Sequence, residues 1–542
     1  MDDSTQPEKQ RRRRGAKARA VTDEKVSLDP KSLKRKIEEA LKRSDSTIRS
    51  LEKKDDMIDG KKKKQKAPKE GEDGYMSNTQ IRNARKRRSK QRKQQIPDTS
   101  DGDDVDGGDD TSGPKKKRKK NKKKGLNKDP SLRYINDPKA APLVKKAKTY
   151  FEEKKIPFQV HVSKTSGWRT VSKLPVRRSS DDDNTTIIGL FKPGSHTIVK
   201  VPDCIAHHSS INKTITFLEK ECDKFGIEPF NEINGEGSLR YVCINVERST
   251  GKVQLTLVWN ASPYKDGEEN EGKDALHKFA NHLVSQADSI QLHSLWIHFN
   301  AQSKHADNIF DFGSKSSGDD LWKHIYGPKH ITESLSFPEC PAPEKVNLCF
   351  PPNVFRQANL DAFANIVTSI RQYILSYTEE RSEKALPTCV ELYGGVGTIG
   401  LNLCDLFTKL NSSDENPNNK ACFEAACASL SEKICGNCTY ISKNATDVIK
   451  EANVLSKDCE VLIVDPPRKG LDEFVTKSFI DATERIDGPK LLVYVSCGFD
   501  AFIRDCDALV GSGKWKLVKA EGHLLFPGAD AIETLAFFRT TS

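Results

Sequence analysis

The first 130 residues of the chain have few large apolar side chains from which a core could form. Tyr75 is their only aromatic residue, and they contain no cysteine. A segment of this composition cannot bury enough apolar surface to offset the entropy that folding costs. We therefore expect residues 1–130 to be a disordered tail, and the remaining ~410 residues to fold as two domains.

Other features are absent from the whole chain. No apolar run reaches the roughly 18–20 residues that cross a bilayer, so we expect no membrane-spanning segment. The start, Met1–Ser4, is polar and acidic, and we expect neither a secretory signal nor a transit peptide there. The 14 cysteines are spread between Cys204 and Cys506, which favours reduced thiols inside the cell over a secreted disulfide scaffold.

Positive charge is concentrated in the tail. Residues 1–130 hold 41 Lys and Arg against 24 Asp and Glu, a net charge of +17, whereas the rest of the chain carries −5. Pro114–Lys119 has the form of a short nuclear-import signal, and such basic runs also neutralise nucleic-acid phosphates. We expect a nuclear protein, with the nucleolus as a candidate compartment; the alternative is a solvated charge run without an address.

Residues 131–345 mix short strands with a few helices, which predicts an α+β domain. The pattern predicts a helix over 142–155, strands over 158–163, 170–176 and 295–298, a β-hairpin over 238–260 and a second helix over 274–287. Trp168 has two open interpretations, a base-stacking residue or a core residue.

Residues 346–542 alternate strands with helices, which indicates a doubly wound, parallel, Rossmann-like α/β sheet. The expected strands are 388–392, 460–464 and 490–496, with a helix through Leu410 after the first. Ligands of such sheets bind outside the carboxyl ends of the strands. Three sequence elements whose side chains could bind a ligand or react lie at such ends.

The first element is the glycine-rich loop Glu391–Gly400. It is neither a P-loop nor a good dinucleotide fingerprint, but its glycines let a ligand approach the backbone closely. Glu424, an acidic residue expected after the next strand, could accept hydrogen bonds from a ribose diol. This combination suits an adenosine-containing cofactor such as S-adenosylmethionine.

The second element is Asp465-Pro-Pro-Arg468, where consecutive prolines fix an extended exit from a strand and aim Asp465 into the crevice. Methyltransferases that act on exocyclic amines use a similar Asp-Pro-Pro followed by an aromatic residue. Arg468 in that place argues against amine methylation and suits a phosphate or a uracil carbonyl.

The third element is Cys497, which directly follows the strand over 490–496. Methylation at C5 of a pyrimidine needs a thiolate that adds to C6 and a base that removes the C5 proton. Glu533, before a final strand, is the candidate base. A cysteine at a strand end is often inert packing, but the neighbouring cofactor loop and Asp465 favour catalysis.

Two further groups were weighed as metal sites. Cys204 with His207 and His208 offers three ligands without a second cluster, and Cys435-Gly-Asn-Cys438 is a lone Cys-x-x-Cys pair. We therefore expect no metal site.

Together these residues resemble the RNA uracil-5-methyltransferase family, whose members make 5-methyluridine in tRNA and rRNA. The resemblance covers about residues 320–542. It rests on six ordered segments: Ile325-Tyr326-Gly327 with Ile331-Thr332-Glu333, Phe355-Arg-Gln357-Ala-Asn359, Leu392–Leu401, Asp465–Leu471, Tyr494–Cys497 with Arg504-Asp505, and Phe526-Pro527 with Ile532-Glu533-Thr534.

The resemblance implies a role for each matching residue. The methyl-donor site would be lined by five residues, Gln357, Tyr393, Thr398, Glu424 and Asp465. Cys497 would be the nucleophile and Glu533 the proton acceptor, with S-adenosylmethionine as cofactor. The cysteine cluster that carries an iron–sulfur centre in some members is absent, because residues 131–203 contain no cysteine.

The chain departs from the family pattern at four places. Gly498-Phe499 replaces Asn-Pro after the nucleophile, and Gly528–Ala531 replaces a histidine-rich stretch before the base. Asn444 stands where the family often has an Asp that contacts the adenine region, and residues 408–420 look like an insertion before Glu424.

These observations predict an S-adenosylmethionine-dependent RNA (uracil-C5) methyltransferase, acting as a monomer on tRNA or rRNA. Residues 131–345 would hold the RNA while the base is flipped out, and residues 346–542 would be the methyltransferase domain. The alternatives are an RNA base-amine methyltransferase on the same fold and a non-catalytic nuclear RNA-binding factor with a decayed site.

Overall fold

The computed structural model describes residues 129–179, 185–192, 195, 197–264, 271–301, 310, 321–381, 385–456 and 459–541. The predicted tail therefore lies almost entirely outside the described residues. Within these ranges, no helix is long and apolar enough to cross a membrane. The strands described form a seven-stranded sheet, an eight-stranded sheet and a two-stranded pair, β9 (Ile331–Glu333) with β10 (Leu348–Phe350).

The seven-stranded sheet is formed by residues from the first half of the folded chain. Its strand order is β4 (Ile198–Lys200), β3 (Thr186–Phe191), β2 (Val171–Arg178), β5 (Leu239–Val246), β6 (Val253–Trp259), β7 (Leu292–Phe299) and β8 (Trp322–Tyr326). β5 and β6 form the predicted antiparallel hairpin. The helices α4 (Ser209–Lys224) and α5 (Glu271–Ser285) pack their apolar sides, including Ile215, Leu218 and Phe279, into one core with this sheet.

The eight-stranded sheet has a parallel half and a mixed half. The parallel half is β13 (Cys438–Ser442), β12 (Lys409–Asp414), β11 (Thr388–Leu392), β14 (Val461–Val464) and β15 (Leu491–Ser496). The mixed half continues with β17 (Glu533–Thr540) and β16 (Trp515–Leu524), which are antiparallel to each other, and ends with β1 (Phe158–Val162).

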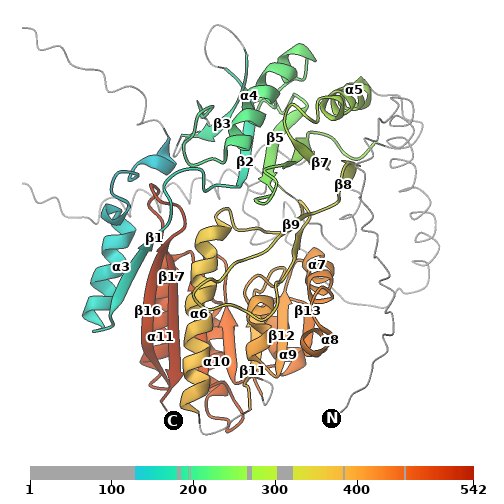
Figure 1. Ribbon diagram of the computed structural model, residues 1–542. Helices are drawn as coiled ribbons and strands as arrows, with labels where there is room; N and C mark the ends of the chain where they lie inside the picture. Colours follow the sequence, from blue (N-terminus) through green and yellow to red (C-terminus); the bar gives the residue numbers. More distant parts are fainter. Residues whose placement is uncertain are drawn as a thin grey trace, which may run out of the picture. The chain divides into compact units, whose positions relative to one another are not determined.

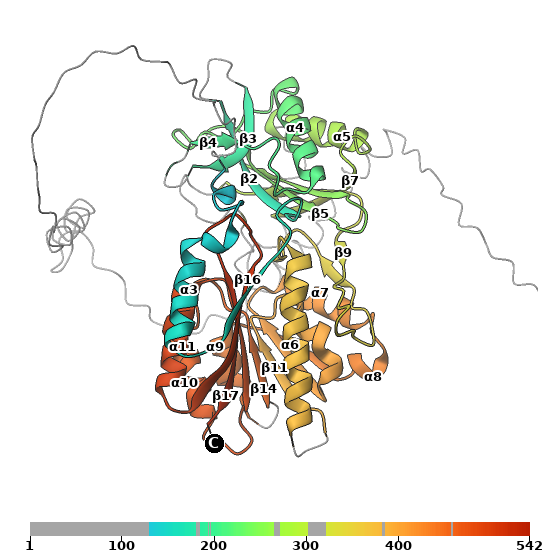
Figure 2. The same cartoon turned by 60° about the vertical axis from the view of Figure 1, so that its left-hand side comes forward.

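Helices cover both faces of this sheet, as the doubly wound α/β prediction requires (Figures 1 and 2). One face packs against α6 (Leu360–Glu380), α7 (Asn418–Cys427), the short α8 (Glu432–Cys435) and the 3-10 helix η4 (Gly400–Leu406). The other face packs against α3 (Pro142–Glu153), α9 (Ala445–Ala452), α10 (Glu473–Ala482) and α11 (Phe499–Gly511).

Two local expectations differ from the structure. The strand over residues 158–163, expected in the α+β domain, is β1 and pairs in parallel with β16 of the eight-stranded sheet, and α3 buries Val144 and Phe151 in the same core. A periodic pattern predicts a strand but not its partner, which here is distant in the sequence. The helix expected through Leu410 is instead η4 followed by β12.

Candidate active site

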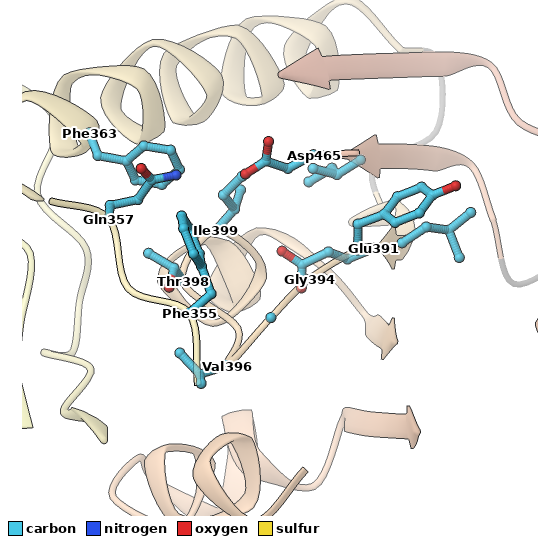
Figure 3. A pocket seen from close by; sticks show the side chains of 13 residues that line it. Phe355, Gln357, Phe363, Glu391, Gly394, Val396, Thr398, Ile399 and Asp465 are labelled. Carbon is cyan, nitrogen blue, oxygen red and sulfur yellow. The ribbon is translucent and has the colours of Figure 1, made fainter. Parts of the chain in front are cut away.

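A pocket opens at the carboxyl ends of β11 and β14. Its cavity volume is about 40 Å³. Four of the predicted methyl-donor residues line it together: Gln357, Tyr393, Thr398 and Asp465 (Figure 3). Phe355, whose side chain is 65% exposed, and the buried Glu391 also line it and were not predicted as site residues.

Glu391 shapes the glycine-rich loop. Its carboxylate accepts hydrogen bonds from the Gly400 amide (2.8 Å) and the Ser412 hydroxyl (2.6 Å). A Cβ atom on Gly394 would lie 2.7 Å from the same carboxylate, so only glycine fits there. Burial raises the pKa of Glu391 to about 7. Tyr393 holds a left-handed backbone conformation (φ 60°), which is rare without glycine and is found at strained functional loops.

Glu424 does not line the pocket. It lies on α7 with a 61% exposed side chain and pairs with Lys420 at 3.8 Å. The acidic residue at the end of the strand next to β11 is Asp414, whose carboxylate accepts a hydrogen bond from the Gly395 amide (3.1 Å). Residues 409–414 form a strand and are not part of an insertion. The acidic residue expected after the strand next to β11 is therefore Asp414, ten positions before Glu424.

Asp465 follows β14 on a rigid loop. Asp505 of α11 ties this loop down by accepting hydrogen bonds from the Leu471 amide (2.8 Å) and the Tyr494 hydroxyl (2.7 Å). Arg504 donates to the Lys469 carbonyl (2.9 Å). Burial, together with the nearby negative charges of Glu391 and Asp414, raises the pKa of Asp465 to about 7.

Cys497 and Glu533 meet where β15 and β17 pair. The last register pair is Ser496 with Thr534, so these two residues are the next neighbours beyond it. Cys497 is exposed, whereas Glu533 is 5% exposed. Partial burial, then the charges of Glu533 and Asp465, raise the pKa of Cys497 to about 11, while the positive charge of Arg468 opposes the rise. Burial and Asp465 also raise the pKa of Glu533 well above its usual value.

The structure explains the departures that flank these residues. A Cβ atom on Gly498 would lie 2.3 Å from the Arg468 carbonyl oxygen, so glycine lets the Asp465 loop pack directly behind the nucleophile. The stretch before Glu533 binds the N-terminal segment: the Gly528 carbonyl accepts from the Tyr134 amide (2.8 Å), and Asp530 accepts from the Leu143 amide at the start of α3 (2.9 Å).

The segment that carries Gln357 is anchored between the two large sheets. Its neighbour Arg356 is 6% exposed and donates to the Val246 carbonyl of β5 (2.8 Å) and to Glu333 of β9. Arg248, in the β5–β6 turn, donates to the same Glu333 carboxylate (2.8 Å). The position of Gln357 in the pocket therefore depends on contacts with the seven-stranded sheet.

Trp168, His207 and His208, which the sequence suggested as base-stacking or metal-binding residues, make contacts within the protein. Trp168 is 1% exposed and packs edge-on against Phe526, with ring centroids 5.4 Å apart. His207 is hydrogen bonded to Ser172 and Asn212, and His208 caps α4.

The groups in the pocket fit S-adenosylmethionine: the glycines allow close approach, and Asp465 and Gln357 add polar groups. Asp414 is not among the lining residues, but it ends the adjacent strand and binds the amide of the lining residue Gly395. Fold and pocket define an S-adenosylmethionine-dependent methyltransferase.

No protein-family model matches the chain. The chain is 34% identical over 384 residues to an uncharacterized RNA methyltransferase of Protochlamydia amoebophila, covering 70% of this chain and 88% of that one. It belongs to the RNA uracil-5-methyltransferase family.

Two other similarities agree with this assignment. An uncharacterized RNA methyltransferase of Lactococcus lactis is 25% identical over 379 residues, which cover 70% of this chain and 72% of the relative. Among solved structures, the tRNA (uracil-54, C5)-methyltransferase of Pyrococcus abyssi in complex with S-adenosyl-L-homocysteine superposes with a TM-score of 0.51 at 20% identity, covering 73% of this chain and 82% of that one. At this identity the superposition supports the fold.

Proposed function

We propose that this RNA methyltransferase methylates C5 of a uridine, with Cys497 as the nucleophile and Glu533 as the base. The observation that carries the proposal is the juxtaposition of these two side chains at the β15–β17 pair, beside the Asp465 that lines the cofactor pocket. A thiol and a carboxylate facing one ring are what the C5 reaction requires.

The proposed reaction begins with the addition of the thiolate to the uracil ring. The Cys497 thiolate forms a bond to C6 of the uracil, and the electron pair of the C5–C6 double bond makes C5 nucleophilic. C5 forms a bond to the methyl group that bound S-adenosylmethionine would supply, and the sulfonium–methyl bond breaks to leave a neutral thioether. Glu533 then takes the C5 proton, the C5–C6 double bond re-forms, and Cys497 leaves as a thiolate.

Arg468 supports the first step. The positive charge of its guanidinium lowers the pKa of the Cys497 thiol against the opposing effects of burial and nearby carboxylates. A cation near the sulfur stabilises the thiolate, which is the reactive form.

Asp414 replaces Glu424 in the proposed cofactor site. Its carboxylate ends β12 beside the glycine loop, where it can accept hydrogen bonds from the ribose diol. Gln357, Tyr393, Thr398 and Asp465 complete the site.

We also propose a substrate RNA and a cellular compartment. The similarity to a protein named as a tRNA (uracil-54, C5)-methyltransferase favours tRNA, with rRNA as the alternative. We propose that the seven-stranded-sheet region holds the RNA, and that the basic tail directs the protein to the nucleus.

The test uses cellular RNA substituted with 5-fluorouridine, S-adenosylmethionine and purified protein. Fluorine at C5 cannot leave as a proton, so the bond between Cys497 and C6 persists. We expect a denaturation-resistant protein–RNA adduct that is absent in Cys497→Ala, and sequencing its RNA identifies the substrate. Absence of an adduct from protein that binds the cofactor would refute the C5 reaction and favour amine methylation or RNA binding without catalysis.

A further inference from the structure

Three ligating side chains gather on the outer strands of the eight-stranded sheet. β1 pairs in parallel with β16, and His161 lies opposite His523 in the register. Glu521 is two residues before His523 and therefore faces the same side of the sheet. Its Oε2 atom lies 3.2 Å from Nε2 of His523 and 3.8 Å from Nε2 of His161.

We propose that His161, Glu521 and His523 form a binding site for a divalent transition-metal ion, with Zn²⁺ as the best match. One ligating atom from each residue lies within 4.8 Å of the others, so small side-chain movements bring all three around one ion. Two imidazoles and a carboxylate are a donor set that Zn²⁺ binds, and solvent would supply the fourth ligand.

The arrangement also leaves a polar atom without a partner. Nε2 of His161 is buried and has no hydrogen bond, because the nearest Glu521 oxygen lies beyond hydrogen-bond distance. An unpaired buried nitrogen is unfavourable, and an ion between the two side chains would satisfy it. Lys519 binds the other oxygen of Glu521 at 2.8 Å and so orients the carboxylate, and a bound ion would take the place of the hydrogen bond between Oε2 and Nε2 of His523.

The proposed ion would fasten the edge of the sheet. β1 is the outermost strand and is preceded by α3, so a ligand from β1 and two from β16 would tie both elements to the sheet. His523 is also the register partner of Glu533, so the site adjoins the strand pair that carries the proposed base. The proposal goes beyond methyl transfer and does not depend on it.

The experiment is a titration of untagged, full-length, metal-free protein with Zn²⁺ and, separately, with Co²⁺. We expect one tightly bound Zn²⁺ per chain, a higher melting temperature, and a visible Co²⁺ absorption band typical of tetrahedral sites. His161→Ala and His523→Ala should weaken binding by more than the roughly 10–100-fold that loss of an outer-shell partner causes.

Matched controls separate this site from other metal-binding groups. His293→Ala removes a half-buried histidine from β7 and should leave binding unchanged. Cys435→Ser and Cys438→Ser should also leave it unchanged. Because His161 lies on an edge strand with a 38% exposed side chain, His161→Ala decides the question if His523→Ala fails to fold. Absent binding, binding unchanged in His161→Ala, or binding lost in the cysteine variants would overturn the proposal.

Discussion

The parallel and mixed halves of the eight-stranded sheet carry different groups to the same edge. In the parallel half, Asp414 ends β12 and Asp465 directly follows β14, and both lie at one edge because the carboxyl ends of parallel strands meet there. In the mixed half, β17 runs the opposite way, so its first residue, Glu533, reaches that edge at the start of a strand. Reversing one strand thus brings the proposed base beside the pocket that the parallel strands form.

In the proposed reaction, the parallel half binds the cofactor and the mixed half supplies the proton acceptor, with Cys497 between them directly after β15. Variants should therefore divide into two groups. Substitutions at the Cys497–Glu533 pair should impair chemistry and leave cofactor affinity unchanged, whereas substitutions around β11 and β12 should weaken cofactor binding.

The largest expected effect follows Cys497→Ala. Without the thiol, C5 cannot be activated, and methyl transfer to RNA should fall by ~10⁴-fold or more. Calorimetry should give unchanged affinity for S-adenosylmethionine, and Cys340→Ser, a half-buried cysteine elsewhere, should retain activity. A parallel loss of cofactor affinity in Cys497→Ala would show that the two halves do not act separately.

Glu533→Gln should lower turnover by roughly 10²–10⁴-fold, because the amide cannot take the C5 proton. The methylated base should stay bonded to Cys497, so a covalent protein–RNA adduct should accumulate on ordinary uridine-containing RNA. Denaturing gels and mass spectrometry of the adduct provide the measurement. Slow turnover without any adduct would place the defect before the proton-removal step and contradict the assigned role.

The pH dependence of activity should follow the ionisation of the Cys497 thiol. Since the pKa of Cys497 is raised to about 11, the thiolate fraction rises with pH across the neutral and mildly alkaline range, and Glu533, also with a raised pKa, loses its proton in the same direction. Activity should increase with pH. Arg468→Gln should raise the thiol pKa further and cost about tenfold in neutral-pH activity per pKa unit. An unshifted profile would exclude Arg468 from thiolate stabilisation.

The smallest expected effect distinguishes Asp414 from Glu424 as the acidic residue that binds the cofactor ribose. Asp414→Asn should weaken S-adenosylmethionine binding about tenfold, the scale of one hydrogen bond to a charged group. Glu424→Ala should leave affinity unchanged, because that side chain is exposed on α7. Equilibrium titration of the two variants gives the comparison directly, and the reverse ranking would restore the sequence-based assignment.

Much of the methyltransferase fold was predictable because strands and glycine loops leave local signals. Thr388–Leu392 is a strand with the bounds expected, and Gln357, Tyr393, Thr398 and Asp465 do line one pocket. β12 was not recognised because its residues, Lys409–Asp414, are mostly polar and lack the apolar run expected of a buried strand. That omission displaced the predicted ribose-binding acid to Glu424.

By itself, the sequence determined the class of fold and the family, because these depend on short segments in a fixed order, and it nominated Cys497, Glu533 and Asp465 as site residues. Tertiary structure alone decided that β1 joins the C-terminal sheet, that Asp414 ends the strand beside the cofactor loop, and that His161 meets Glu521 and His523. Each of these is a pairing between segments whose local patterns do not encode their partners, since strand pairing is settled by the burial of the whole sheet.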